Sequence, residues 1–172
     1  MYQDQINAYF ADKEQQFLDI ASKLIAIPSP RGETQPGFPY GKAPAEALAA
    51  ALDILKEMGF SPKNMENHVG IADLNDKETL MAILCHLDVV PEGTGWQTPA
   101  YRPVVKNGHL YGRGSSDNKG PAAAAMLAMQ AVKEMNIPLK YNTRLILGTA
   151  EETGSQDITY YRQHEKTPPY TS

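Results

Sequence analysis

Two polar residues follow an apolar run in the segment AILCHLDVV, where His86 and Asp88 stand two positions apart. Side chains at this spacing in a strand point to the same face, so the imidazole and the carboxylate can meet. A neutral imidazole binds metal ions, and a carboxylate that accepts the other ring N–H fixes the tautomer. A buried histidine that only hydrogen-bonds a neighbouring aspartate is the alternative. A Cys85–His86 nucleophilic pair is disfavoured, because neighbouring strand residues face opposite sides.

Asp117 stands in the segment YGRGSSDNKGP, where a glycine-rich loop enters an expected helix. Three interpretations are open for this carboxylate. It can cap the helix, because aspartate is favoured there. It can belong to a phosphate-binding loop, although a carboxylate in the sixth position would repel phosphate and no Walker motif is present. It can also bind metal ions, since its two oxygens are able to bridge two cations.

Glu151 and Glu152 are adjacent at the end of an apolar strand in the segment LGTAEETG. Two exposed glutamates are usually just solvated, whereas charges at the end of a buried strand are costly if nothing binds them. Neighbouring side chains diverge, so one glutamate can bind a metal ion while the other faces a water molecule as a general base. Lys119 could pair with one of these carboxylates, or it could be an exposed lysine at a helix start.

The elements that position these residues follow from the spacing of apolar residues and from the positions of proline and glycine. We expect helices over 4–26, 44–58, 118–135 and 157–165; strands over 68–74, 79–86 and 141–152; and a hairpin over 100–114 that turns at Asn107-Gly108. The strand 79–86 is nearly all apolar, so we place it in the centre of the sheet. Alternation of strands and helices predicts an α/β fold.

Ligands of open α/β sheets bind beyond the carboxyl ends of the strands. His86, Asp88, Asp117, Glu151 and Glu152 all follow expected strands or begin a helix, so we expect them to meet at one edge. One histidine with several carboxylates suits zinc, with manganese or cobalt as substitutes.

Bulk composition limits the classes of protein that remain. The chain has 172 residues, a net charge of −4 and a single cysteine. The charge gives no basic surface for nucleic acid and no polybasic membrane patch. One cysteine cannot form an internal disulfide, the polar N-terminus does not resemble a secretory signal, and no apolar run is long enough to span a membrane. We therefore expect a cytoplasmic protein.

The segments HLDVVPEG, YGRGSSDNKGP and LGTAEETG together resemble the co-catalytic zinc peptidases of clan MH. This family includes carnosinases, bacterial Xaa-His dipeptidases, aminoacylases and desuccinylases. The bacterial dipeptidase branch is the most similar, since YGKAP and DITYYRQHEKTP also resemble it. The resemblance implies a three-layer αβα catalytic domain with a mixed sheet, of which residues 1–172 form the N-terminal part.

The resemblance also implies a role for each candidate residue. His86 would bind one zinc ion and Asp88 would orient His86. Asp117 would bridge two zinc ions, and its peptide bond to Asn118 would be cis. Glu152 would bind the second zinc ion, and Glu151 would be the general base for a water molecule shared by both ions.

The resemblance is partial, because a further acidic ligand, a distant histidine and an inserted lid domain have no counterpart in this chain. His164 does not match the missing histidine, and we expect it at the surface. We therefore expect weak metal binding, impaired hydrolysis of small peptides, and self-association through an exposed sheet edge. The alternatives are an N-acyl amino acid deacylase or desuccinylase, a non-catalytic fragment that only binds or assembles, and a nucleotide-binding domain.

Overall fold

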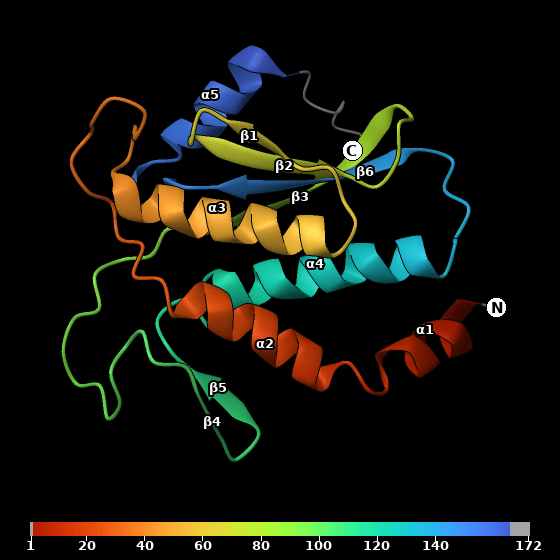
Figure 1. Cartoon of the computed structure of the whole chain (residues 1–172), viewed down its shortest axis with the longest axis horizontal. Helices are drawn as coiled ribbons and strands as arrows, with labels where there is room; N and C mark the ends of the chain where they lie inside the picture. Colours follow the sequence, from red (N-terminus) through yellow and green to blue (C-terminus); the bar gives the residue numbers. More distant parts are fainter. Residues whose placement is uncertain (1, 166–172) are drawn as a thin grey trace.

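A computed structural model describes residues 2–165 as a mixed sheet with helices on both faces (Figure 1). The helices are α1 (Tyr2–Phe10), α2 (Glu14–Ile25), α3 (Lys42–Glu57), α4 (Lys119–Glu134), the short 3₁₀ helix η1 (Glu151–Thr153) and α5 (Gln156–His164). The strands are β1 (Lys63–Met65), β2 (Val69–Asp73), β3 (Thr79–His86), β4 (Val104–Lys106), β5 (His109–Tyr111) and β6 (Asn142–Gly148). The predicted α/β class is confirmed.

The main sheet has the order β1-β2-β6-β3 and contains both strand directions. β2 pairs antiparallel with β1 and β6, whereas β3 and β6 are parallel. In this parallel pair His86 lies opposite Gly148, the last residue of β6. The carboxyl ends of β3 and β6 therefore lie side by side, and the residues that follow each strand leave the sheet at the same end.

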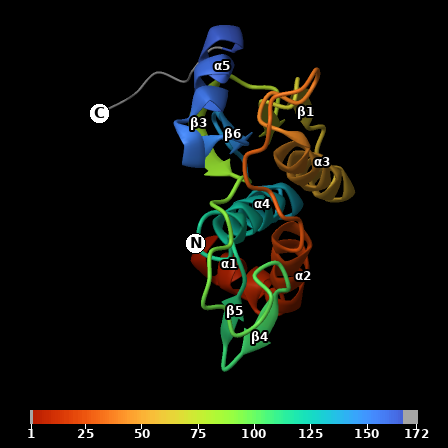
Figure 2. The same ribbon diagram turned by 90° about the vertical axis from the view of Figure 1, so that its left-hand side faces the viewer.

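One face of the sheet is covered by α3 and α4, and α2 packs against these two helices on their side away from the sheet (Figure 1). The apolar sides of the three helices form the large core. The alanine-rich helix α4 is buried along most of its length. On the other face α5 contributes Tyr161 to a smaller cluster with β1, β2 and β6. Figure 2 shows α5 on the side of the sheet opposite α3 and α4. The arrangement is the predicted three-layer αβα order.

The single helix expected over 4–26 is wrong, because the chain turns between α1 and α2. The backbone N–H groups of Ala11 and Lys13 donate to the carbonyls of Ala8 and Phe10, so the bonds here close shorter turns than an α-helix. α1 has no buried residue, whereas α2 packs four residues into the core. The apolar spacing therefore continues across the turn into α1, although α1 does not pack into the core.

The central position expected for the strand 79–86 is also wrong. Within the described sheet β3 lies at an edge, and β6 is its one partner. Met81 and Leu84 are 56% and 54% exposed as residues, while Cys85 packs into the large core. A nearly continuous apolar run is typical of strands covered on both faces, and in the described residues only one face of β3 is covered.

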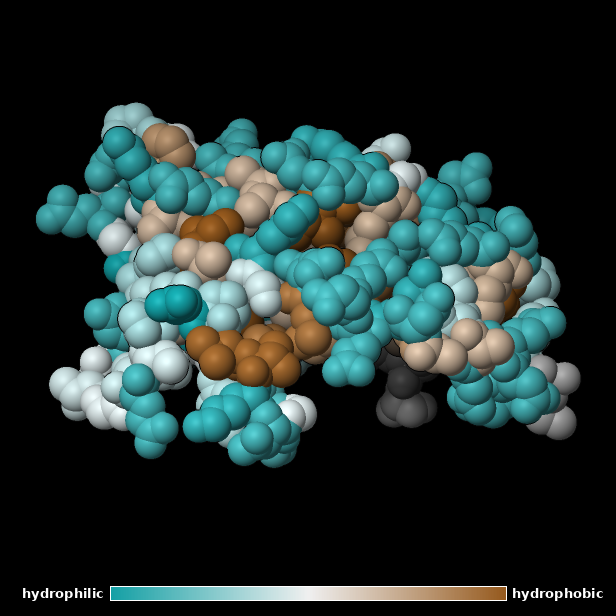
Figure 3. Space-filling view, turned by 60° about the horizontal axis from the view of Figure 1, so that its bottom comes forward, coloured by the Kyte–Doolittle hydropathy of each residue, from teal (hydrophilic) through white to brown (hydrophobic). Residues whose placement is uncertain are grey.

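The hairpin of β4 and β5 forms a separate sheet that projects from the body of the molecule (Figure 2). Its predicted turn is confirmed, since Asn107 and Gly108 both have positive φ, at 53° and 74°. Two-residue hairpin turns need this conformation. Figure 3 views this side of the molecule and shows hydrophobic residues in patches between hydrophilic ones. No helix in residues 2–165 has the length and apolar character to cross a membrane.

Candidate metal centre

The five candidate residues come from three neighbouring places at one edge of the sheet. His86 ends β3, and Asp88 lies two residues beyond it. Asp117 lies two residues before α4, while Glu151 and Glu152 begin η1 just after β6. Because β3 and β6 are parallel neighbours, their carboxyl ends bring these segments together, as expected for ligand sites in open α/β sheets.

The imidazole of His86 is buried and has carboxylates around both ring nitrogens. Its Nε2 atom lies 2.9 Å from Oδ1 of Asp117 and 3.9 Å from Oε2 of Glu151. Its Nδ1 atom lies 3.0 Å from the backbone oxygen of Asp88 and 3.4 Å from the Asp88 carboxylate. Nε2 therefore faces the open side of the site, where Asp117 and Glu151 lie.

Asp88 is fully buried and contacts both sides of the site. Besides lying beside His86, its Oδ1 and Oδ2 atoms accept hydrogen bonds from the backbone N–H groups of Glu151 and Glu152, at 3.2 and 3.0 Å. A negative charge at the start of a short helix is favourable, because the N–H groups there lack other partners. Asp88 thus joins the end of β3 to the start of η1.

Asp117 faces His86 from the loop before α4. The N-cap position of that helix is occupied by Asn118, and the Asp117 carboxylate contacts His86 instead. The helix-cap interpretation of Asp117 is therefore wrong. The Asp117–Asn118 peptide bond is cis, as the resemblance implied. The side chain of Asp117 is 73% exposed, and one of its oxygens contacts His86 while solvent reaches the carboxylate.

Glu151 and Glu152 converge on His86 rather than diverging into solvent. One ligand atom from each of His86, Glu151 and Glu152 lies within 4.8 Å of the other two. Burial raises the pKa of Glu152, and the negative charge of Asp117 raises it further. This crowding of carboxylates makes the site attractive to a cation.

The electrostatic field of the site also acts on His86. Burial alone would lower the pKa of this imidazole, but hydrogen bonds with Asp88 and Asp117 outweigh burial and raise the pKa to about 9. The surrounding carboxylates therefore favour a positive charge at Nε2. A metal ion and a proton compete for that nitrogen, and the same carboxylates would stabilise either.

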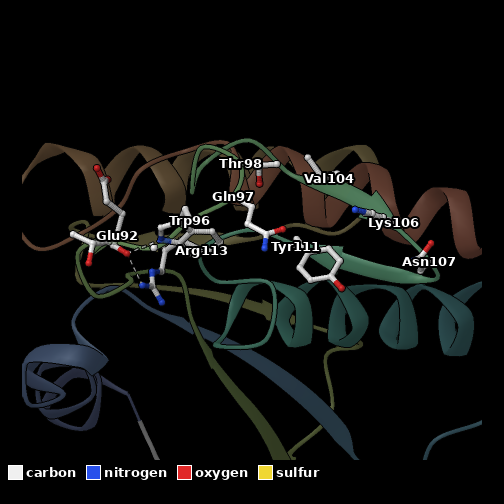
Figure 4. Close-up of a pocket in the computed structure, with 12 residues that line it drawn as sticks. Glu92, Trp96, Gln97, Thr98, Val104, Lys106, Asn107, Tyr111 and Arg113 are labelled. Carbon is white, nitrogen blue, oxygen red and sulfur yellow. Dashed lines mark hydrogen bonds between the residues drawn. The ribbon is translucent and has the colours of Figure 1, made fainter.

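Three of the five candidate residues share one cavity of about 300 Å³. His86, Asp117 and Glu151 line it, together with Gly148 and Asp157. A larger cavity of about 720 Å³ lies between the loop 92–98 and the hairpin, where Trp96 and Tyr111 face it (Figure 4). None of the five candidate residues lines that larger cavity, so we place the chemistry in the smaller one.

Lys119 differs from both interpretations made from the sequence. Its side chain is fully buried, and Nζ donates to the backbone oxygen of Ile27 at 2.6 Å. Burial lowers its pKa to about 8, and the negative charge of Asp88 acts in the opposite direction. Lys119 is therefore neither exposed nor paired with a glutamate, and it ties the start of α4 to the segment that follows α2.

Asp157 was missed by the sequence analysis, which placed it in a short helix without a role. It is fully buried, and its carboxylate accepts hydrogen bonds from the backbone just before Glu151. One feature of the sequence could have pointed to Asp157: it is an aspartate in the first turn of an expected helix, shortly after two glutamates. Cys85 is buried in the core, and burial raises the pKa of its thiol. His164 is exposed, as expected.

The donor set fits a zinc-type site. Zinc takes imidazole nitrogen and carboxylate oxygen as ligands, and catalytic sites combine these with an open position. His86 supplies the nitrogen, Glu151 and Glu152 lie within reach of a common centre, and Asp117 contributes a carboxylate on the same side. These residues could hold a divalent cation at the solvent side of Nε2.

Comparisons with known proteins agree with this geometry. Residues 82–168 match the family model described as peptidase family M20/M25/M40. The putative dipeptidase YtjP of Bacillus subtilis is 34% identical over 91% of this chain, and the Beta-Ala-Xaa dipeptidase of Lactobacillus delbrueckii subsp. lactis is 36% identical over 91%. The chain spans about a third of the length of these relatives, 34% in each case.

Solved structures give the same result for the fold. Human carnosine dipeptidase 1 superposes with a TM-score of 0.80 at 26% identity, covering 96% of this chain and 38% of its own. Bacillus subtilis YXEP, a dinuclear metal-binding peptidase of the M20 family, superposes with a TM-score of 0.61 at 14% identity, covering 87% of this chain and 40% of its own. The family match covers half of the sequence and includes His86, Asp117 and both glutamates. This chain belongs to the peptidase family M20/M25/M40.

Proposed function

We propose that this chain is the N-terminal part of the catalytic domain of a metal-dependent dipeptidase, and that residues 1–172 carry most of its metal centre. The observation that carries the proposal is the convergence of His86, Asp117 and Glu151 around one cavity, with Glu152 beside them. Bringing carboxylates from three distant segments close together costs free energy, and a bound cation or substrate would offset that cost.

Each residue has a role in this proposal. His86, Asp117 and Glu152 would hold two divalent ions, with zinc as the first choice and manganese or cobalt as substitutes. Asp117 would be a ligand common to both ions. Asp88 lies against Nδ1 of His86, so it would keep Nε2 directed at the ions. When bound, the ions would act as Lewis acids for a water molecule and for the amide carbonyl.

Glu151 would be the general base. Its side chain is 52% exposed and its Oε2 atom lies 3.9 Å from Nε2 of His86, so it borders both the ligand group and solvent. It would accept a proton from the attacking water molecule and deliver that proton to the amine that leaves. Asp88 holds the backbone N–H of Glu151, which limits the motion of this carboxylate relative to His86.

The substrate class is proposed from the relatives. Two of them are a Beta-Ala-Xaa dipeptidase and a human carnosine dipeptidase. We infer that the protein takes dipeptides of the Xaa-His kind. An N-acyl amino acid deacylase or desuccinylase would use the same centre, and a fragment that only binds or assembles would leave it idle. Both alternatives are outcomes of the assay below.

The assay uses the 172-residue chain and a chimera in which it replaces the matching third of Bacillus subtilis YtjP. Each protein is loaded with Zn²⁺ and given β-alanyl-histidine, N-acetyl-methionine or N-succinyl-diaminopimelate. We expect the chimera to hydrolyse the dipeptide, the chain alone to be much slower, and Glu151→Gln to abolish activity in the chimera. Preference for an acylated amino acid would favour the deacylase, and a folded chimera that hydrolyses none of the three would contradict the proposal.

We also propose that copies of the chain associate through β3. The outer edge of β3 is unpaired within residues 2–165, and Met81 and Leu84 are more than half exposed beside it. An open edge with apolar side chains is a template for another strand. The corresponding test is given in the Discussion.

A further inference from the structure

The backbone that leads into the glutamate pair is held by Asp157. Both Thr149 and Ala150 donate their backbone N–H groups to Oδ2 of Asp157, at 2.6 and 2.9 Å. All three residues are fully buried. Two hydrogen bonds to one ionised oxygen are stronger than bonds between neutral groups, so this segment has little freedom to rotate.

The next two N–H groups along the chain are held by the other buried aspartate. Glu151 and Glu152 donate to Asp88 at 3.2 and 3.0 Å. Four consecutive backbone donors, those of residues 149–152, therefore end on two buried carboxylates that come from different elements. Asp88 follows β3 and Asp157 lies in α5, so the segment is held from both sides.

The carboxylate of Asp157 fits beside the backbone only because residue 148 is a glycine. A Cβ atom built on Gly148 would overlap Oδ2 of Asp157, closer than real Cβ contacts come. Gly148 is also the residue opposite His86 in the parallel pair. Any side chain at position 148 would displace Asp157 from the backbone that it binds.

We propose that Asp157 is a positioning residue of the metal centre, which fixes the backbone at Thr149 and Ala150 so that the carboxylates of Glu151 and Glu152 converge on His86. The inference rests on the proposed function, because it gives those carboxylates a metal to bind. Asp157 itself turns its oxygens to backbone N–H groups and acts only through the segment that it holds.

A simpler role would be to start helix α5. Oδ1 of Asp157 accepts the backbone N–H of Ile158, within the first turn of that helix. If Asp157 served only the helix, its loss would lower the stability of the fold and leave metal affinity unchanged in the folded fraction. Metal affinity compared at matched stability therefore separates the two roles.

The test is a titration of the 172-residue chain with Co²⁺ alone, followed by the paramagnetic shifts of the His86 ring in NMR spectra, which detect weak binding. In Asp157→Asn one oxygen becomes an N–H donor that faces the backbone N–H groups of Thr149 and Ala150 or that of Ile158, and the remaining oxygen loses its charge. In Gly148→Ala the added methyl group displaces the carboxylate without changing charge. We expect both to weaken Co²⁺ binding by about 10-fold to 100-fold, as for other residues that orient ligands.

Two further variants decide between outcomes. Leu55→Ala removes a buried core side chain in α3 and serves as the control for lost stability, which urea unfolding measures in every variant. Glu152→Gln removes a proposed ligand. Weaker Co²⁺ binding in Asp157→Asn and Gly148→Ala, but not in Leu55→Ala, supports the inference; if Asp157→Asn does not fold, Gly148→Ala decides.

The contrary outcomes are distinct. Unchanged Co²⁺ affinity in Asp157→Asn or in folded Gly148→Ala, together with loss in Glu152→Gln, overturns the role of Asp157 and leaves the metal centre standing. An equal loss in Leu55→Ala also overturns it, because a general loss of stability then explains the effect. No Co²⁺ shift at His86 in the unsubstituted chain, or full binding by Glu152→Gln, overturns the proposed metal centre and the inference with it.

Discussion

Oδ1 of Asp117 lies 2.9 Å from Nε2 of His86, although 31 positions separate the two residues in the sequence. The contact joins the end of β3 to the loop before α4. It directs the metal-binding nitrogen of the imidazole toward a carboxylate on the open side of the cavity. Asp88 contacts the other ring nitrogen, Nδ1, so the two aspartates hold the ring orientation from both sides.

Replacing Asp117 with asparagine should lower the pKa of His86. The raised value of about 9 depends on hydrogen bonds with Asp88 and Asp117, which outweigh the opposite effect of burial. A neutral amide no longer stabilises the imidazolium, so the pKa should fall toward its usual value of about 6.5. NMR titration of the ring protons without added metal measures it, with the exposed Asp53→Asn as the control. An unchanged pKa in Asp117→Asn would show that Asp117 does not contact the ring in solution.

Replacing Asp88 with asparagine should destabilise the fold and loosen the glutamate pair. The carboxylate is buried and accepts two backbone hydrogen bonds, from Glu151 and Glu152. Asparagine offers one acceptor oxygen in place of two, so one buried N–H group loses its partner at a cost of about 1–3 kcal/mol. Urea unfolding checks the loss, and faster amide exchange at Glu151 or Glu152 locates it. Stability equal to that of Asp53→Asn would contradict this account of Asp88.

The ion pair of Asp73 with Arg144 should make stability depend on acid pH. Burial raises the pKa of Asp73, but hydrogen bonds from Arg144 and Asn142 outweigh it and lower the pKa overall. A lowered folded-state pKa gives stability that is present above the unfolded value, about 3.9, and is lost as pH falls through the folded value.

Asp73→Asn should therefore lower the free energy of unfolding by about 1 kcal/mol at pH 7, a magnitude typical of such pairs. Below the folded-state pKa the difference should vanish, because the native aspartate is then neutral too. Urea unfolding between neutral and acid pH measures both limits. A constant difference across that range would mean that the charge of Asp73 is not what stabilises the fold.

The open edge of β3 should cause association of the isolated chain. The double variant Met81→Lys with Leu84→Lys puts charges on that edge and should shift sedimentation toward monomer, because lysines at an edge oppose pairing. Val105→Lys, which changes an exposed valine on the hairpin, is the matched control. If the unsubstituted chain sediments as a monomer at all concentrations, association through β3 is excluded.

The sequence allowed the fold class and the convergence of the candidate residues to be predicted, because both depend on local patterns. Strand-end polar residues and the glycine-rich approach to α4 identified His86, Asp117 and the glutamate pair, and parallel pairing of β3 with β6 brings them together. The order of strands was not readable, because pairing between distant segments leaves no periodic signal in one sequence. β3 was therefore misplaced at the centre of the sheet.

Lys119 and Asp157 show the second limit of sequence reasoning. Each is a charged residue at a helix start, where a solvent-exposed position is the ordinary expectation. Each is buried instead, because its partner is a backbone group that only the fold brings near: the carbonyl of Ile27 for Lys119, and the N–H groups of Thr149 and Ala150 for Asp157. Every residue type carries the same backbone groups, so no sequence motif predicts which backbone group a buried side chain will bind.

The most direct test of the metal centre is anomalous X-ray scattering at the zinc edge from crystals of this chain grown with Zn²⁺. The account predicts a peak about 2.0–2.1 Å from Nε2 of His86, the usual distance from zinc to a histidine nitrogen, with carboxylate oxygens of Asp117 or Glu152 also bound to it. A map with no anomalous peak at His86, or with the imidazole turned away from Asp117 and Glu152, would contradict it.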